Sequence, residues 1–199
     1  MKRALLIISV CVLLAAALYF FPTVEEAELY DSTLRLHVLA ASDSPRDQEL
    51  KLIVRDAVLA YAASITEGCG SKEEAEAVMI RRTDEIARIS EETLRLHGCS
   101  EKVTVSLGKE YYPTRAYENL RLPAGEYTSL RVMIGDAEGQ NWWCVLFPPL
   151  CTDTATRPVE ESLAVGFTEG QIRILTDAEH PRYVLKFRIL EILGELFRK

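Results

Sequence analysis

The residues best suited to chemistry in this chain are its histidines and cysteines, and their spacing predicts no active site. Nucleophilic catalysis needs a cysteine or serine close to a histidine that a carboxylate orients. Cys144 with His37 is the pair to consider, but neither lies in a sequence pattern typical of a cysteine hydrolase. His37, His97 and His180 stand apart, and no CxxC or HExxH spacing occurs. We therefore assign no catalytic residue, cofactor or metal.

Four cysteines follow the hydrophobic N-terminus, and an even number favours disulfides in an exported chain. Cys69 and Cys99 flank a long predicted helix, which at roughly 27 residues separates them by about 40 Å. A disulfide holds its Cα atoms about 4.4 to 6.8 Å apart. Cys144 and Cys151 are close in sequence and enclose a pair of prolines. We predict a bridge between Cys144 and Cys151, and the alternative is two buried thiols.

The N-terminus is predicted to be an export signal. Residues 4–21 carry no charge and follow Lys2 and Arg3. At about 1.5 Å per residue the run reaches roughly 27 Å, close to the thickness of a bilayer core of about 30 Å. The positive flank predicts a cytoplasmic N-terminus, with the rest of the chain outside the cytoplasm. Residues 1–22 are thus a signal peptide or a membrane anchor, because the small residues 15–17 allow cleavage and the apolar residues 18–21 allow retention.

The composition is that of a folded, acidic domain. Of 199 residues, 48% are hydrophobic and 27% are charged, and the net charge is −7. The first 21 residues hold two basic residues and no acid, so the remainder carries 21 basic and 30 acidic residues, a net charge of −9. Nucleic acid is therefore excluded as a partner, because binding phosphates needs a basic face. Residues 30–199 are predicted to form one extracytoplasmic domain.

Two helices are predicted near the start of this domain. Residues 33–41 alternate between apolar and other side chains, as in a half-buried strand. Ser44 and the Pro45 that follows it are typical of a helix start, which predicts a helix over 45–64. A second cap at Ser71 predicts a longer helix that Gly98 ends.

The rest of the pattern predicts mostly sheet. Strands are expected over 103–107, 127–134 and 142–147, the last two joined as a hairpin through 135–139, and a final helix over 183–197. The predicted fold class is α+β, a mainly antiparallel sheet packed by two central helices and a C-terminal helix, preceded by the hydrophobic signal or anchor.

Three peptides in this chain resemble the stage II sporulation protein R family. They are LRLHVLAASDSPRDQELKLIVRDAVL from Leu34, YYPTRAYENLRLPAGEYTSLRVMIGDAEGQNWWCVLFPPLC from Tyr111, and YVLKFRILEIL from Tyr183. The resemblance implies a protein made in the forespore and exported into the space between two membranes. There it would activate a membrane-embedded aspartic protease of the mother cell, which removes the pro-sequence of the sigma-E precursor. It would be a signalling ligand, not an enzyme, with no small-molecule substrate.

Candidate contact residues for such a partner come from three segments. Two tryptophans beside two amides suit a protein interface, and strand alternation places the tryptophans on opposite faces, unless both pack inside. A polar and aromatic pair precedes them, and the first helix carries a charged stripe that is either functional or simply solvated. The candidates are Gln140, Asn141, Trp142 and Trp143; Arg115 and Tyr117; and Asp43, Gln48, Lys51, Arg55 and Asp56.

The rival function is a cell-wall-associated binding module or hydrolase, which would also be exported and acidic. It would show a deep cleft holding a carboxylate of raised pKa. A lipid-facing structural protein would instead carry a basic amphipathic helix, whereas the helices expected here are mixed or acidic.

Overall fold

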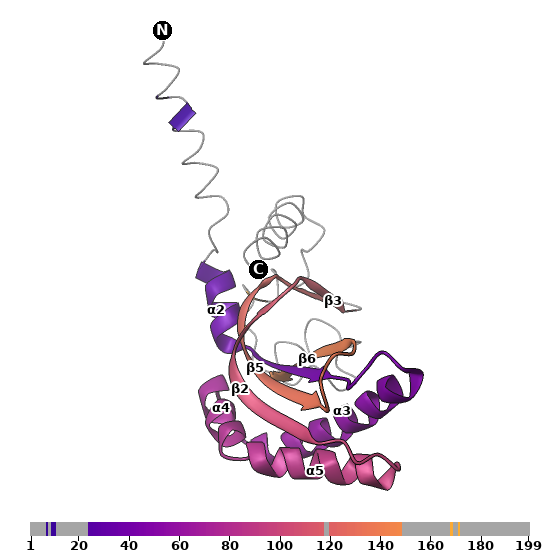
Figure 1. Cartoon of the computed structure of the whole chain (residues 1–199). Helices are drawn as coiled ribbons and strands as arrows, with labels where there is room; N and C mark the ends of the chain where they lie inside the picture. The colour runs from indigo at the N-terminus through magenta and orange to yellow at the C-terminus, as the bar shows by residue number, and fades with distance from the viewer. Residues whose placement is uncertain are drawn as a thin grey trace.

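A computed structural model describes residues 24–117 and 120–148, together with Ile7, residues 9–10, Thr168 and Gln171. The helices are α2 (Val24–Ser32), α3 (Pro45–Thr66), α4 (Lys72–Ile80) and α5 (Thr83–Leu96). The strands are β1 (Leu34–Leu39), β2 (Val103–Tyr112), β3 (Arg115–Tyr117), β4 (Leu120–Leu122), β5 (Gly125–Ile134) and β6 (Asn141–Phe147). Figure 1 shows α3, α4 and α5 on one side of the sheet and β3 on the other.

The fold class is α+β, but the sheet is mixed, so the prediction of a mainly antiparallel sheet was wrong. Its four strands lie in the order β2-β5-β1-β6. β1 runs parallel to β5 and antiparallel to β6, while β2 is antiparallel to β5. A separate antiparallel pair joins β3 to β4.

The predicted hairpin between β5 and β6 was also wrong, because β1 lies between these strands. Their connection crosses the end of β1 and bonds to the chain there. The amide of Gly139 donates to the carbonyl of Ala40 (3.0 Å), and the amide of Glu138 to that of Ala41 (3.2 Å). A Cβ at position 139 would lie 2.3 Å from the carbonyl oxygen of Ser42, so this crossing requires glycine.

The first predicted helix is confirmed as α3. The hydroxyl of Ser44 accepts a hydrogen bond from the amide of Asp47 (3.1 Å), and Pro45 occupies the first turn. Both features satisfy or remove amides that have no partner within the helix. Leu50, Val54 and Val58 recur at helical spacing and are buried against the sheet.

The second predicted helix is two helices, α4 and α5, that meet at Arg81 and Arg82. Ser71 caps α4 as predicted, through a hydrogen bond to its hydroxyl from the amide of Glu74 (3.2 Å). The chain leaves helical geometry at Arg82, a charged residue that lies between the buried positions Met79 and Ile86. The break lets each helix direct its own apolar residues to the core, with Met79 from α4 and Ile86 from α5 both buried.

The main core lies between this helix layer and one face of the sheet. That face is built from alternate residues of all four strands, and the helices supply the facing residues. Its fully buried members include Leu34, Leu36, Val38, Leu130, Val132, Val54, Val58, Ile86 and Leu94.

Two predictions fall outside the described residues. These are the N-terminal signal or anchor over 1–22 and the C-terminal helix over 183–197. In the part of the chain that the structure describes, no helix has the length and apolar character needed to span a bilayer. Helix α2, which no sequence pattern predicted, directly precedes β1 in the chain, and its Leu29 is buried.

Candidate interaction site

The start of α3 is tied to the β5–β6 connection by a buried lysine. The Nζ atom of Lys51 donates to the side chain of Gln48 (2.6 Å) and to the backbone carbonyl of Gln140 (3.0 Å). The amide of Gln140 in turn donates to the carboxylate of Asp43 (2.7 Å). Four predicted candidates, far apart in sequence, thus form one network that fixes the connection against the helix.

Lys51 is 4% exposed, so a simply solvated stripe on α3 is the wrong interpretation for this residue. Burial lowers the pKa of Lys51 from its ordinary value, and the nearby charge of Asp43 opposes that shift in part. A buried ammonium is retained only where partners satisfy it, and here Gln48 and Gln140 accept its hydrogen bonds.

Next to this network, an aromatic and charged group reaches the surface. Trp142 on β6 is 38% exposed, and the guanidinium carbon of Arg55 lies 4.3 Å from the centroid of its ring. Arg55 also pairs with Asp56, Nη2 to Oδ1, at 2.7 Å. We call Arg55, Asp56 and Trp142 the tryptophan patch. Arg55 and Asp56 form an ion pair, and the guanidinium of Arg55 packs on the flat face of the Trp142 indole.

Trp143 lies on the opposite face of the sheet, as strand alternation predicts, and is half-buried. The guanidinium carbon of Arg115 on β3 sits 3.6 Å from its ring centroid. The rings of His37 and Tyr112 lie 5.5 and 6.2 Å away, centroid to centroid. Since Trp142 is partly exposed, the alternative in which both tryptophans pack inside is wrong.

We call the sheet face that points away from α3, α4 and α5 the second face. On this face His37 connects three strands. Its Nδ1 lies 2.8 Å from the carboxylate of Glu110 on β2, and its Nε2 lies 2.9 Å from the side-chain oxygen of Asn141 on β6. Arg131 on β5 approaches the same carboxylate, Nε to Oε1, at 3.6 Å.

Burial alone would raise the pKa of Glu110. The hydrogen bond and charge of His37, the charge of Arg131 and a hydrogen bond with Ser129 outweigh it, so the pKa lies below its ordinary value.

Sequence reasoning missed how thoroughly this second face is buried. Arg35 is 0% exposed, with its guanidinium carbon 3.9 Å from the ring centroid of Tyr112 and 5.0 Å from that of Tyr127. Burial raises the pKa of Tyr112 well above its ordinary value, and its hydroxyl is hydrogen-bonded to Ser129. The available signal was a strand that alternates apolar residues with Arg35 and His37, together with tyrosines on the later strands.

Comparison with known proteins identifies the family. The model of the family described as "Stage II sporulation protein R (spore_II_R)" matches residues 30–157. The chain belongs to the stage II sporulation protein R family. It is 38% identical over 158 residues to stage II sporulation protein R of Bacillus subtilis (strain 168), covering 75% of this chain and 70% of that protein. No solved structure matches it.

Membership of the stage II sporulation protein R family supports a role in sporulation, in a family of signalling proteins. The structure groups the predicted residues into the tryptophan patch with its Lys51 network and, on the opposite face, Arg115, Asn141 and Trp143. Tyr117 ends β3, and its side chain lies outside what the structure describes.

The cysteines of this family member are only partly described. Cys69 and Cys99 are free, although the single long helix from which their separation was argued is two helices. Cys144 is buried at 7% exposure and carries no free thiol. Its predicted partner Cys151 lies outside the described residues, so the pairing stays a prediction.

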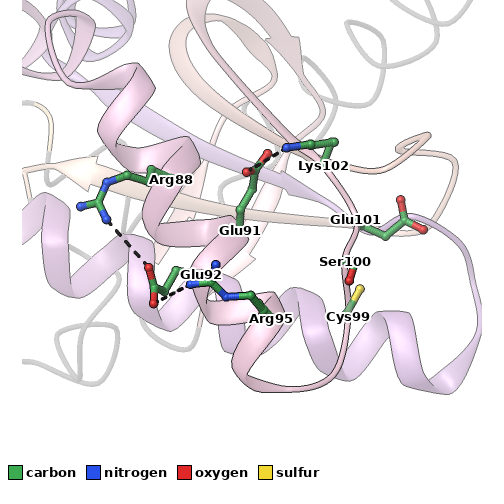
Figure 2. Close-up of a pocket in the computed structure, with 8 residues that line it drawn as sticks. All are labelled: Arg88, Glu91, Glu92, Arg95, Cys99, Ser100, Glu101 and Lys102. Carbon is green, nitrogen blue, oxygen red and sulfur yellow. Dashed lines mark hydrogen bonds and ion pairs between the residues drawn. The ribbon is translucent and has the colours of Figure 1, made fainter.

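An open pocket of about 220 Å³ lies beside α5 (Figure 2). Its acids and bases largely pair with one another, Glu92 with Arg95 at 2.8 Å and Glu91 with Lys102 at 3.4 Å. None of the predicted site residues lines it, and we assign it no ligand. The lining residues are Arg88, Glu91, Glu92, Arg95, Cys99, Ser100, Glu101 and Lys102.

Proposed function

We propose that this protein is the extracytoplasmic sporulation signal that activates the membrane-embedded aspartic protease processing the sigma-E precursor. In this proposal it is made in the forespore, and its N-terminal segment exports it to the space facing the mother cell. It acts as a ligand of the protease and not as an enzyme. Family membership supports the sporulation role, and the resemblance of the three peptides supports the more specific pathway.

The tryptophan patch is the observation that carries the ligand proposal. Tryptophan, tyrosine and arginine are enriched among the few residues that supply most of the binding energy of protein interfaces. Trp142 is one of few large hydrophobic residues exposed in the described part of the chain, and Arg55 and Asp56 flank it. The patch therefore offers a partner an apolar anchor within a polar rim.

The Lys51 network makes this patch rigid before binding. Gln140, one residue before β6, is held by both Asp43 and Lys51, which fixes the start of the strand that carries Trp142. Arg55 lies one turn beyond Lys51 on α3, so the helix that anchors the network also positions the guanidinium over the indole. Preorganisation of this kind lowers the entropic cost of ordering side chains on binding.

The test is reconstitution in vegetative cells that also hold the cognate protease and the sigma-E precursor. The full chain is produced in these cells, and precursor cleavage is followed by immunoblot. We expect cleavage that requires both the chain and the protease. Absence of cleavage, with the chain shown to be exported and folded, would contradict the proposal and favour the cell-wall-associated alternative.

The patch is tested in the same cells with Trp142→Ala and a matched control. Leu96 is also exposed, at 76%, and lies at the end of α5. Leu96→Ala therefore removes exposed apolar surface away from the patch. We expect cleavage to fall about tenfold or more with Trp142→Ala, as for the loss of an interface hot spot, and to be unchanged with Leu96→Ala. Equal cleavage by both variants would show that the tryptophan patch is not part of the interface with the protease.

A further inference from the structure

The first observation concerns β2, which forms one edge of the four-stranded sheet (Figure 1). The carbonyl of Lys102 accepts a hydrogen bond from the amide of Gly135 (2.8 Å), so the backbone groups of Lys102 face β5. In antiparallel pairing these directions alternate from residue to residue. The backbone groups of Val103 therefore face away from the sheet, and its amide indeed donates to the carboxylate of Glu91 on α5 (3.2 Å).

By the same alternation, the amides and carbonyls of Val105, Leu107 and Lys109 point outward. Among the described residues, none of these three makes a backbone hydrogen bond on that side. An edge strand with free donors and acceptors is a template for another strand. Natural edges are usually short, bulged or covered, whereas β2 is a regular strand of 10 residues.

Gly108, in the middle of this edge, is not explained by contacts with the described residues. Its backbone is in the ordinary extended region, and a Cβ added there would meet nothing within 4 Å. Glycine inside a strand weakens it, and such glycines are found at bulges, at bends and where another backbone comes close.

We infer that β2 pairs antiparallel with β2 of a second copy of this chain, with Val105 opposite Val105. The hydrogen-bonding pattern lets the register shift only in steps of two residues. In this register Lys109 faces Glu101, Val103 faces Leu107, and Thr104 faces Ser106. Cross-strand pairs of opposite charge, of apolar residues and of hydroxyl residues all stabilise a sheet. Shifting by one step in either direction separates Lys109 from Glu101.

Both charges lie at the surface, and the carboxylate of Glu101 rests beside Gly135. Within the described part of the chain, neither Glu101 nor Lys109 forms an ion pair, and both are exposed. Figure 2 shows Glu101 directed away from the ion pairs that line the pocket. Gly108 would face Lys102 of the second copy, whose side chain is 87% exposed in the single chain. The missing side chain at position 108 leaves open space opposite Lys102, whose ammonium stays with Glu91 of its own chain.

Pairing displaces one contact within the chain. The amide of Val103 would bond to Leu107 of the second copy instead of to Glu91. Glu91 keeps its ion pair with Lys102, 3.4 Å away, so its charge is not left without a partner. The inference does not depend on the proposed protease activation, because it concerns a different edge of the sheet from the tryptophan patch.

A cysteine placed at the symmetry axis gives the first test, on the full chain in non-ionic detergent. In Val105→Cys the two Cα atoms would lie about 5.5 Å apart, within disulfide range. In the control Leu107→Cys, four residue positions separate the two cysteines, about 13 Å. After mild oxidation we expect a covalent dimer from Val105→Cys beyond that of the unsubstituted chain, and none from Leu107→Cys. No added dimer, or equal dimer from both variants, would overturn the inference.

Exchanging the charges at positions 101 and 109 distinguishes two roles for Lys109, which either pairs with a second copy or blocks association at the edge. An exposed lysine on an edge strand can instead serve to block association. We expect Lys109→Glu to weaken dimerisation about tenfold, because two symmetric ion pairs are lost, and the double variant with Glu101→Lys to restore it. The measurement is sedimentation of the full chain across a range of concentrations. Unchanged or tighter association of Lys109→Glu, or a monomer at every concentration, would show that the edge is protected or reserved for another protein.

Discussion

The two faces of the central sheet differ in chemistry although the same strands build both. On the helix side, Leu36 and Val38 of β1 join an apolar core. On the other side, Arg35 and His37 of the same strand are buried among aromatic rings and a carboxylate. The first face is held by shape and apolar burial, which many residues can supply. The second is held by specific charged and aromatic pairs, so conservative replacements there should be tolerated far less.

The largest expected effect comes from neighbouring residues of β1 that point to opposite faces. Leu36→Ala and Arg35→Ala should each lower the free energy of unfolding by about 3 kcal/mol, through a cavity in one case and lost ring contacts in the other. The conservative changes should then separate the faces. Leu36→Met should cost less than about 1.5 kcal/mol, and Arg35→Lys about 2 kcal/mol, because an ammonium cannot stack as a guanidinium does.

The measurement for these four variants is urea unfolding of the full chain in non-ionic detergent, followed by circular dichroism. Equal costs for Leu36→Met and Arg35→Lys would show that the second face tolerates substitution as the apolar core does.

The adjacent tryptophans provide the next comparison. Trp143 is half-buried between Arg115 and His37, so Trp143→Ala should cost about 3 kcal/mol of stability. Trp142 contributes chiefly to the surface, and Trp142→Ala should cost about 1 kcal/mol. The same unfolding measurement tests both. If Trp142→Ala were as destabilising as Trp143→Ala, the patch would be a structural element and not a surface prepared for a partner.

A smaller effect should appear in acid, through Glu110. Its folded pKa lies below its ordinary value of 4.5, so the unfolded chain binds more protons as pH falls. The stabilisation is therefore present above about pH 4.5 and is lost as pH falls through the folded pKa. Glu110→Gln should reduce stability at neutral pH and flatten its decline in acid. A decline equally steep in this variant would assign the acid sensitivity to other carboxylates.

Local features of the fold were predictable from sequence, and its long-range pairing was not. The Ser44 and Ser71 caps are set by neighbouring residues, and both were found as expected. Alternation located the strand β1, but β1 is buried on both faces, so the prediction of a half-buried strand was wrong. The insertion of β1 between β5 and β6 depends on contacts about 100 residues apart, which no local pattern encodes. A short connection between two strands suggests a hairpin, but Gly139 lets this one cross the end of β1 instead.

The candidate site shows the same division. Residues such as Trp142 and Arg55 were identifiable by type, because tryptophan and arginine side chains are enriched at interfaces. The grouping of these residues with Lys51 could not be predicted, since it requires α3 to lie beside β6. Glu110 and Arg131 were missed because an isolated charge in a strand gives no sign of the histidine or aromatic ring that it meets across the sheet.

The central claim, that the tryptophan patch contacts the membrane protease, is tested most directly by photo-crosslinking in living cells. A photoreactive phenylalanine replaces Trp142 in the full chain, or Leu96 as the exposed control, in cells that also make the protease. We predict a light-dependent adduct between the chain and the protease from position 142 and none from position 96. Adducts from position 96 alone, or from neither position while precursor cleavage proceeds, would place the contact elsewhere on the molecule.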